Sequence, residues 1–234
     1  MQKHIVSSYD EELSQLKSHL LTMGSIVEGM LKDSHQALLN MDLDLAQSTI
    51  NLDTSINDME VEGDKLCMNI FVRRQPAASD LRFIVSVSKI LTELERMGDL
   101  SAGIAARVVL LDSHPTQDLG IMPILFERTE RQLSRALTAL AQEDIKLAMT
   151  VLKKEHSIDE TYRNVKQDML SYIHRDASLV DCSLILANIA KLLERIGDHA
   201  TNIAEMVIYF VKAKDVRHIE PKDVADMIKN HSKT

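Results

Sequence analysis

The sequence predicts an all-α fold made of two tandem three-helix bundles that are related by internal duplication. The composition favours helices over strands, because Gly and Pro contribute only 7 and 4 of the 234 residues and both are unfavourable inside a helix. Apolar residues recur at steps of three and four, which is the spacing of one helical face. The duplication is visible in one pentapeptide, since Glu-Arg-Met-Gly-Asp at 95–99 returns as Glu-Arg-Ile-Gly-Asp at 194–198, an offset of 99 residues.

Three helices are expected in the first half, residues 9–112. The apolar pattern and its interruptions place them at about residues 9–40, 42–74 and 79–111. Asp42 or Asp44 can cap the second helix, and the Gln75-Pro76 pair ends it because the residue before a proline disfavours helical geometry. The segment 114–116 then breaks the pattern and separates the two halves.

The second half, residues 116–211, repeats this plan. Its helices are expected to end near residues 142, 175 and 211. The early helices of the two halves match at an offset of 102, as Asp42 with Asp144 and Ile56 with Ile158, whereas the third helices match at 99. A deletion of three residues at the turn near residues 73–76 accounts for the difference. The remaining residues, 212–234, form a C-terminal tail with one short amphipathic helix, and the sequence leaves open whether it docks.

The charge and the apolar runs exclude two classes of partner. A net charge of −8 argues against nucleic acid, whose phosphates would repel the chain. The residues after Met1 contain no apolar run of signal-peptide length, and no uncharged apolar stretch of about 18 residues occurs. We therefore expect a cytoplasmic protein without direct membrane insertion.

Paired carboxylates lie on the last long helix of each half. Glu95 and Asp99 are four residues apart, as are Glu194 and Asp198, so each pair projects from one side of its helix. On a helical wheel, Asn202 and Glu205 share a strip with the second pair, beside the apolar arc. The simple interpretation is a solvated acidic face. The alternative is a set of oxygen ligands for a cation.

The second helix of each half adds carboxylates where apolar residues are expected. Asp53 and Glu155 fall on the apolar seams of their helices, and Asn57 and Asp159 follow four residues later. A carboxylate turned toward neighbouring helices needs a charge partner or hydrogen bonds. Two interpretations stay open: the groups bind metal, or Arg96, Arg195 or a lysine neutralises them. The candidate metal ligands are Asp53, Asn57, Glu95, Asp99, Glu155, Asp159, Glu194, Asp198 and Asn202.

An all-oxygen ligand set favours some metals over others. Carboxylates suit iron, manganese and magnesium better than they suit tetrahedral zinc, which remains possible. A ferritin-like di-iron enzyme would need a Glu-x-x-His pair, and no Glu in the chain has a His three residues later. Gly98 and Gly197 lie in mid-helix, where glycine is unfavourable, and we expect the backbone of an adjacent helix to approach closely there.

The two motifs resemble those of the PhoU family of phosphate-transport regulators. The similarity rests on Glu-Arg-Met-Gly-Asp-Leu-Ser-Ala-Gly-Ile-Ala (95–105) and Glu-Arg-Ile-Gly-Asp-His-Ala-Thr-Asn-Ile-Ala-Glu (194–205), and covers about residues 9–211. It implies multinuclear metal clusters, iron or zinc among them, with Glu95, Asp99, Glu194 and Asp198 as ligands beside Asp53, Glu155 and Asp159. It also implies a cytoplasmic negative regulator that links the ATPase of a phosphate ABC transporter to a sensor histidine kinase.

Two residues depart from the symmetry of the halves. Asn57 stands where the second half has Asp159, and Gly103 stands where it has Asn202. Both changes remove a potential ligand from the first half, so we expect its site to bind metal more weakly than the second.

Three classes of function remain at this point. We expect a non-catalytic adaptor, because no activated nucleophile, phosphate-binding glycine loop or acid–base pair is evident. The alternatives are a metal-dependent hydrolase, in which a bridged cation activates water, and a metal-handling protein. Exposed apolar edges of long helices make a homodimer plausible, although the sequence does not place the interface.

Overall fold

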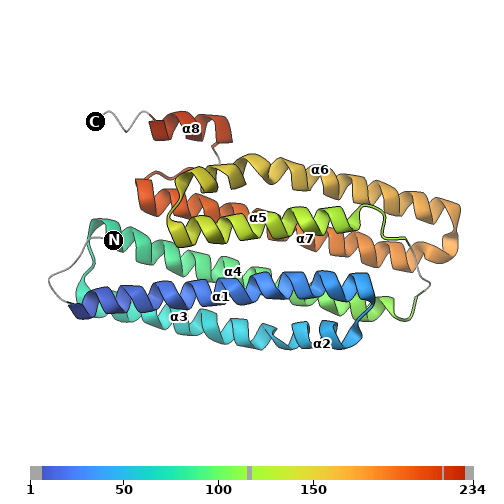
Figure 1. Ribbon diagram of the computed structural model, residues 1–234, viewed down its shortest axis with the longest axis horizontal. Helices are drawn as coiled ribbons and strands as arrows, with labels where there is room; N and C mark the ends of the chain where they lie inside the picture. Colours follow the sequence, from blue (N-terminus) through green and yellow to red (C-terminus); the bar gives the residue numbers. More distant parts are fainter. Residues whose placement is uncertain (1–6, 115–117, 218, 230–234) are drawn as a thin grey trace.

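Long helices arranged in two bundles make up the protein (Figure 1). The computed structural model describes residues 7–114, 118–217 and 219–229. The first half contains α1 (Ser7–Asn40), α2 (Leu43–Asn51), α3 (Asp53–Arg74) and α4 (Ala78–Leu111). The second contains α5 (Met122–Gln142), α6 (Ile145–Arg175), a short 3₁₀ turn (Ala177–Leu179), α7 (Val180–Lys212) and α8 (Pro221–Lys229). The predicted all-α tandem fold is confirmed. Residues 115 and 116 of the expected break lie outside the described residues.

Equivalent caps begin the second helix of each half. The Asp42 carboxylate accepts the backbone N–H of Leu45 at 2.9 Å, and the Asp144 carboxylate accepts that of Lys146 at 2.8 Å. Such bonds satisfy N–H groups that have no partner within the helix. The residues just before, Met41 and Glu143, adopt left-handed backbone conformations with φ of 49° and 57°. Each of these two turns therefore consists of a residue in the left-handed conformation followed by an aspartate that caps the next helix.

The first half departs from the expected single helix over residues 42–74. The structure divides it into α2 and α3 at Leu52, whereas the equivalent α6 is continuous. At the break the Leu52 N–H bonds to the Thr49 carbonyl at 3.3 Å, a tighter 3₁₀-type turn. Asp53 thereby becomes the first residue of α3, where the helix dipole favours a negative charge.

A glycine and an isoleucine fix the approach of two helices in each half. A Cβ added to Gly98 of α4 would lie 3.0 Å from Ile56 Cγ2 of α3. A Cβ added to Gly197 of α7 would lie 2.9 Å from Ile158 Cδ1 of α6. A side chain at either glycine would therefore require the isoleucine that packs there to shift. A neighbouring helix does approach each glycine, but an isoleucine side chain makes the nearest contact and not the helix backbone that the sequence predicted.

The two halves join chiefly where α4 packs along α7. Glu93 Oε2 of α4 accepts a hydrogen bond from Asn202 Nδ2 of α7 at 3.0 Å. At the other end of the contact, Gly103 of α4 lies against Leu192 of α7. Residue numbers rise along α4 as they fall along α7, so the helices are antiparallel. Because Glu93 is equivalent to Leu192 and Gly103 to Asn202 at the offset of 99, the halves are related by an approximate two-fold axis.

A second line of contact joins α1 to α5. Lys17 Nζ lies 2.8 Å from Glu143 Oε1, and His35 Nδ1 lies 2.7 Å from Glu130 Oε1. The His35 ring also stacks on Phe126, with ring centroids 4.3 Å apart. One buried apolar cluster consequently extends through both halves.

The C-terminal tail docks on the second half. Helix α8 packs against α6, and the Val224 side chain is fully buried. The sequence left open whether the tail docks, and the burial of this apolar face shows that it does. The residues from 230 onward lie outside the described part of the chain, as do residues 1–6. Among the described residues, no helix is both long enough and apolar enough to cross a membrane.

We predict that Gly197→Val destabilises the protein by about 2 kcal/mol, because overpacking a filled site typically costs 1–3 kcal/mol. Gly29→Val is the matched control, since a Cβ at Gly29 meets nothing within 4 Å, and we expect a change below about 0.5 kcal/mol. Urea unfolding followed by circular dichroism measures both. Equal losses in the two variants would mean that Ile158 does not restrict position 197.

Candidate functional site

Four carboxylates of the second half gather between α6 and α7. We call them the second carboxylate cluster: Glu155 and Asp159 from α6, with Glu194 and Asp198 from α7. Burial, followed by the negative charges of Asp198, Asp159 and Glu205, raises the pKa of Glu155 to about 7. Burial, followed by the charges of Glu194 and Asp159, likewise raises the pKa of Asp198 to about 6. The four predicted residues are thus close enough to repel one another.

The first half brings together the equivalent residues. We call these the first carboxylate cluster: Asp53 and Asn57 from α3, with Glu95 and Asp99 from α4. Burial raises the pKa of Asp53, and both a hydrogen bond and the charge of Asp99 add to that shift. Burial and the charge of Asp99 also raise the pKa of Glu95. Asn57 Nδ2 donates to Asp53 Oδ2 at 3.4 Å, so the amide contacts the carboxylate that precedes it by one turn.

Among the described residues, cations pair with one carboxylate of each cluster. Arg96 Nε lies 3.4 Å from Glu95 Oε2, and Lys191 Nζ lies 2.5 Å from Glu194 Oε2. Within the described parts of the chain, none of the other cluster carboxylates forms an ion pair with Lys, Arg or His. The salt-bridge interpretation therefore accounts for Glu95 and Glu194 and leaves the other cluster carboxylates, here called the unpaired carboxylates, without an ion pair.

The chemistry of the unpaired carboxylates and of Asn57 fits a hard cation. Asp53 Oδ1 and Asn57 Oδ1 are buried and have no hydrogen-bond partner, which is costly unless an ion or a water supplies one. All donors in both clusters are oxygens, the ligand type preferred by magnesium, manganese and iron. In this conformation, no three His, Cys, Asp or Glu side chains of the described residues are arranged to hold one ion. The clusters thus offer ligands that would have to converge further around a metal.

Asn202 occupies a different position from the other predicted ligands. Its side-chain amide donates to Glu93 across the α4–α7 contact, and Glu93 also accepts from His199 Nδ1 at 2.6 Å. Burial opposes ionisation of Glu93, but these two hydrogen bonds outweigh it and hold its pKa below the usual value. Asn202 therefore also joins the two halves.

A polar hollow of about 450 Å³ lies beside the second carboxylate cluster. Glu155, Asn202 and Glu205 face it from α6 and α7, and Arg217 faces it from the segment that leads to α8. Burial raises the pKa of Glu205 above its usual value, and the charge of Arg217 offsets this shift only in part. The tail therefore borders the carboxylates instead of lying apart from them.

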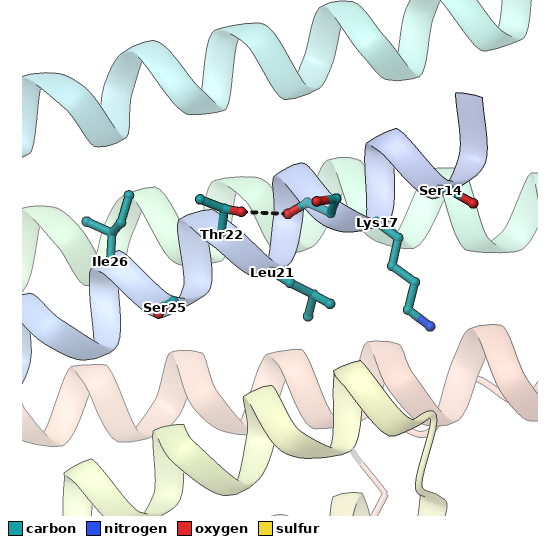
Figure 2. A pocket seen from close by; sticks show the side chains of 7 residues that line it. Ser14, Lys17, Leu21, Thr22, Ser25 and Ile26 are labelled. Carbon is teal, nitrogen blue, oxygen red and sulfur yellow. Dashed lines mark hydrogen bonds between the residues drawn. The ribbon is translucent and has the colours of Figure 1, made fainter. Parts of the chain in front are cut away.

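Another hollow, of about 590 Å³, runs along α1 (Figure 2). Its lining includes Ser14, Lys17, Leu21 and Ile26, all from one helix. The Thr22 hydroxyl bonds to the Ser18 carbonyl of its own helix at 2.9 Å, as the dashed line in Figure 2 shows. No titratable groups from different helices line it, so it offers no candidate site.

Two acidic residues described above, Glu205 and Glu93, were not among the predicted ligands. Glu205 lies on the α7 strip that the helical wheel identified, so its position was available from the sequence. Glu93 was not, because its equivalent in the other half is Leu192 and comparison of the repeats gives no signal.

Comparison with known proteins assigns the family. The sequence model of the PhoU domain matches the chain twice, at residues 20–108 and 123–207. The chain belongs to the PhoU family. The two PhoU domains correspond to the two halves of the structure, and the resemblance noted in the sequence is confirmed.

Similar proteins cover nearly the whole chain. A phosphate-specific transport system accessory protein PhoU homolog from Pseudomonas aeruginosa is 37% identical over 230 residues, which are 97% of this chain and 95% of that protein. The phosphate-specific transport system accessory protein PhoU of Escherichia coli is 34% identical, over 94% of this chain and 91% of that protein.

Solved structures give the same result. The crystal structure of PhoU from Pseudomonas aeruginosa matches with a TM-score of 0.84 and 36% identity, covering 88% of this chain and all of that one. The phosphate transport system regulatory protein PhoU from Streptococcus pneumoniae matches with a TM-score of 0.82 and 26% identity, covering 89% and 99%.

We predict that the metal-free protein loses stability as pH rises from about 5 to 8. Glu155 is protonated in the folded chain up to a pKa of about 7, whereas an unfolded glutamate ionises near 4.3. The folded state therefore binds more protons in this window, and raising the pH favours unfolding. Glu155→Gln should flatten this dependence, leaving the variant more stable than the wild type at pH 8.

Urea unfolding in chelator, repeated between pH 5 and 8, measures the effect. Glu160→Gln is the matched control, because Glu160 lies on the same helix and is exposed. A wild-type slope that Glu155→Gln leaves unchanged would show that Glu155 ionises normally in the folded protein. A residual slope is expected in the variant, since the raised pKa of Asp198 acts in the same direction.

Proposed function

We propose that the protein is a non-catalytic, cytoplasmic negative regulator of phosphate uptake and of phosphate-responsive two-component signalling. The observation that carries this proposal is the match, over nearly its whole length, to proteins named phosphate-specific transport system accessory proteins. In the proposed role, the protein bridges the ATPase subunit of a phosphate ABC transporter and a sensor histidine kinase. The long helices provide extended faces that two such partners could contact separately.

The two carboxylate clusters are proposed to bind metal as part of this role. A bound cation would place a positive charge next to the unpaired carboxylates. It would also tie α3 to α4 and α6 to α7. Asp53, Asn57, Glu95 and Asp99 would hold it in the first half, and Glu155, Asp159, Glu194 and Asp198 in the second. Helix positions that depend on metal would then alter the surface seen by a partner. Iron, manganese and magnesium suit these oxygens best, with zinc possible.

A homodimer is also proposed, and α3 offers a surface for it. Val61, Met68 and Val72 are 52%, 60% and 79% exposed and follow one another at steps of seven and four residues. Exposed apolar side chains along one helix are typical of contact surfaces.

The adaptor role is tested by affinity capture from source cells grown in high and in low phosphate. We expect the wild type to recover a transporter ATPase or a sensor kinase in a phosphate-dependent way, and Glu194→Ala/Asp198→Ala to lose them while remaining helical. Asp58→Ala/Glu62→Ala is the matched control, because it removes an acidic pair of equal spacing from exposed positions on α3. Recovery of neither partner by the wild type would contradict the proposal.

The metal clusters are tested by titration of purified, metal-free protein with manganese and iron. Glu95→Gln/Asp99→Asn leaves the second cluster intact, and Glu194→Gln/Asp198→Asn leaves the first. We predict tighter binding by the former variant, because Asn57 gives the first cluster one carboxylate fewer than Asp159 gives the second. Isothermal calorimetry measures both affinities, and tighter binding by the first cluster would refute the prediction.

A further inference from the structure

A basic pocket of about 270 Å³ lies between α5 and α6 in the second half. Its lining is made of Arg128, Arg131, Gln132 and Arg135 from α5, with Lys154 and Ser157 from α6. Four of these six residues are cationic, in a chain whose net charge is −8. None of them belongs to the carboxylate clusters.

Most of this positive charge has no counter-ion. Arg131 Nη2 approaches Glu127 Oε2 at 3.4 Å, but both side chains are more than half exposed, so the pair is weak. Arg135 and Lys154 form no ion pair with any described residue. Like charges at these helical spacings repel by a few tenths of a kcal/mol, so the group does not serve the stability of α5.

Hydrogen bonds to uncharged acceptors hold the walls of the pocket in place. Arg128 Nη1 donates to the Ser157 carbonyl at 2.8 Å and to the Thr161 hydroxyl. Gln132 is almost fully buried, and its amide donates to the Val151 carbonyl at 2.9 Å. All three bonds join α5 to α6. Because Arg128 uses only one of its nitrogens in them, the rest of its guanidinium keeps donors that could reach a ligand.

The bundle fold does not require these residues. At the offset of 102 that aligns the early helices, the first half places Ile26, Gly29, Met30, Asp33 and Leu52 at the equivalents of Arg128, Arg131, Gln132, Arg135 and Lys154. The same architecture therefore forms without any of the four cations. Their concentration in one half points to binding and not to folding.

We propose that the basic pocket binds a phosphate group, either as free inorganic phosphate or as part of a small phosphate monoester. Guanidinium groups match the geometry of phosphate oxygens, and lysine adds a compact charge. The volume is below the roughly 300–1,000 Å³ of pockets that enclose drug-sized ligands, which suits a small anion. The proposal is separate from the adaptor and metal proposals, because it concerns binding by the purified chain alone.

The test is calorimetric titration of the full chain with inorganic phosphate, at low salt and with chelator present to exclude phosphate held by a metal. We expect saturable binding of about one phosphate per chain by the wild type. Arg135→Gln/Lys154→Gln should weaken it about a hundredfold, since each charged hydrogen-bond donor contributes about tenfold or more. Arg128 is left unchanged because it joins the two helices.

The matched control is Lys146→Gln/Arg175→Gln, which removes the same two charges from exposed positions on α6 outside the pocket. We expect it to bind phosphate within about twofold of the wild type, and thermal unfolding should show that both variants fold. Absence of saturable wild-type binding, or equal weakening in the control, would overturn the proposal.

A parallel titration with glycerol phosphate separates the two sources of the ligand. Tighter binding of the monoester at the same pocket would assign a phosphorylated metabolite, and tighter binding of inorganic phosphate would assign the free ion. Because neither titration involves a partner protein, loss of the pocket proposal leaves the adaptor proposal standing, and the reverse also holds.

Discussion

The close contact between a glycine on one helix and an isoleucine on the next is the constraint on which both candidate metal clusters depend. Ile56 packs against Gly98 and Ile158 packs against Gly197, so closely that a side chain on either glycine would displace the isoleucine. Each isoleucine is flanked in sequence by cluster residues, and each glycine lies between a glutamate and an aspartate. The contact that closes the apolar core therefore also brings carboxylates of two helices together. Their mutual repulsion is the cost of that packing, and a bound cation would relieve it.

Duplication preserved the core of each half and allowed the surfaces to diverge. The caps at Asp42 and Asp144 and the glycine–isoleucine contacts are the same in both halves. The differences are the helix break at Leu52, the change from Asn57 to Asp159, and the basic pocket of the second half, whose cations have no counterpart at the equivalent positions of the first half. A core position must fill a fixed space, whereas a surface position can change its charge at little cost in stability. The two halves can therefore share a fold and differ in what they bind.

The antiparallel α4–α7 contact makes the two halves one body. It combines an apolar contact of Gly103 with Leu192 and a partly buried hydrogen-bond network centred on Glu93. Such a network needs both helices in one register, because its carboxylate would otherwise lose its donors. A change in helix position at either carboxylate cluster can thus be transmitted to the other half through α4 and α7. This arrangement suits a protein whose proposed role is to connect two partners.

The sequence by itself determined the helices, their duplication and the pairing of carboxylates on each helix face. These features follow from periodicity along one helix, which a local pattern records in full. It also located Asp53 and Glu155, since an acid on an apolar seam stands out against its neighbours. Only the tertiary structure decided that Val224 docks on the second half, that Asn202 bonds to Glu93, and that cations of α5 and α6 enclose a pocket. Each of these depends on the distance between side chains of different helices, which is set by packing between segments far apart in the chain and leaves no periodic trace within either one.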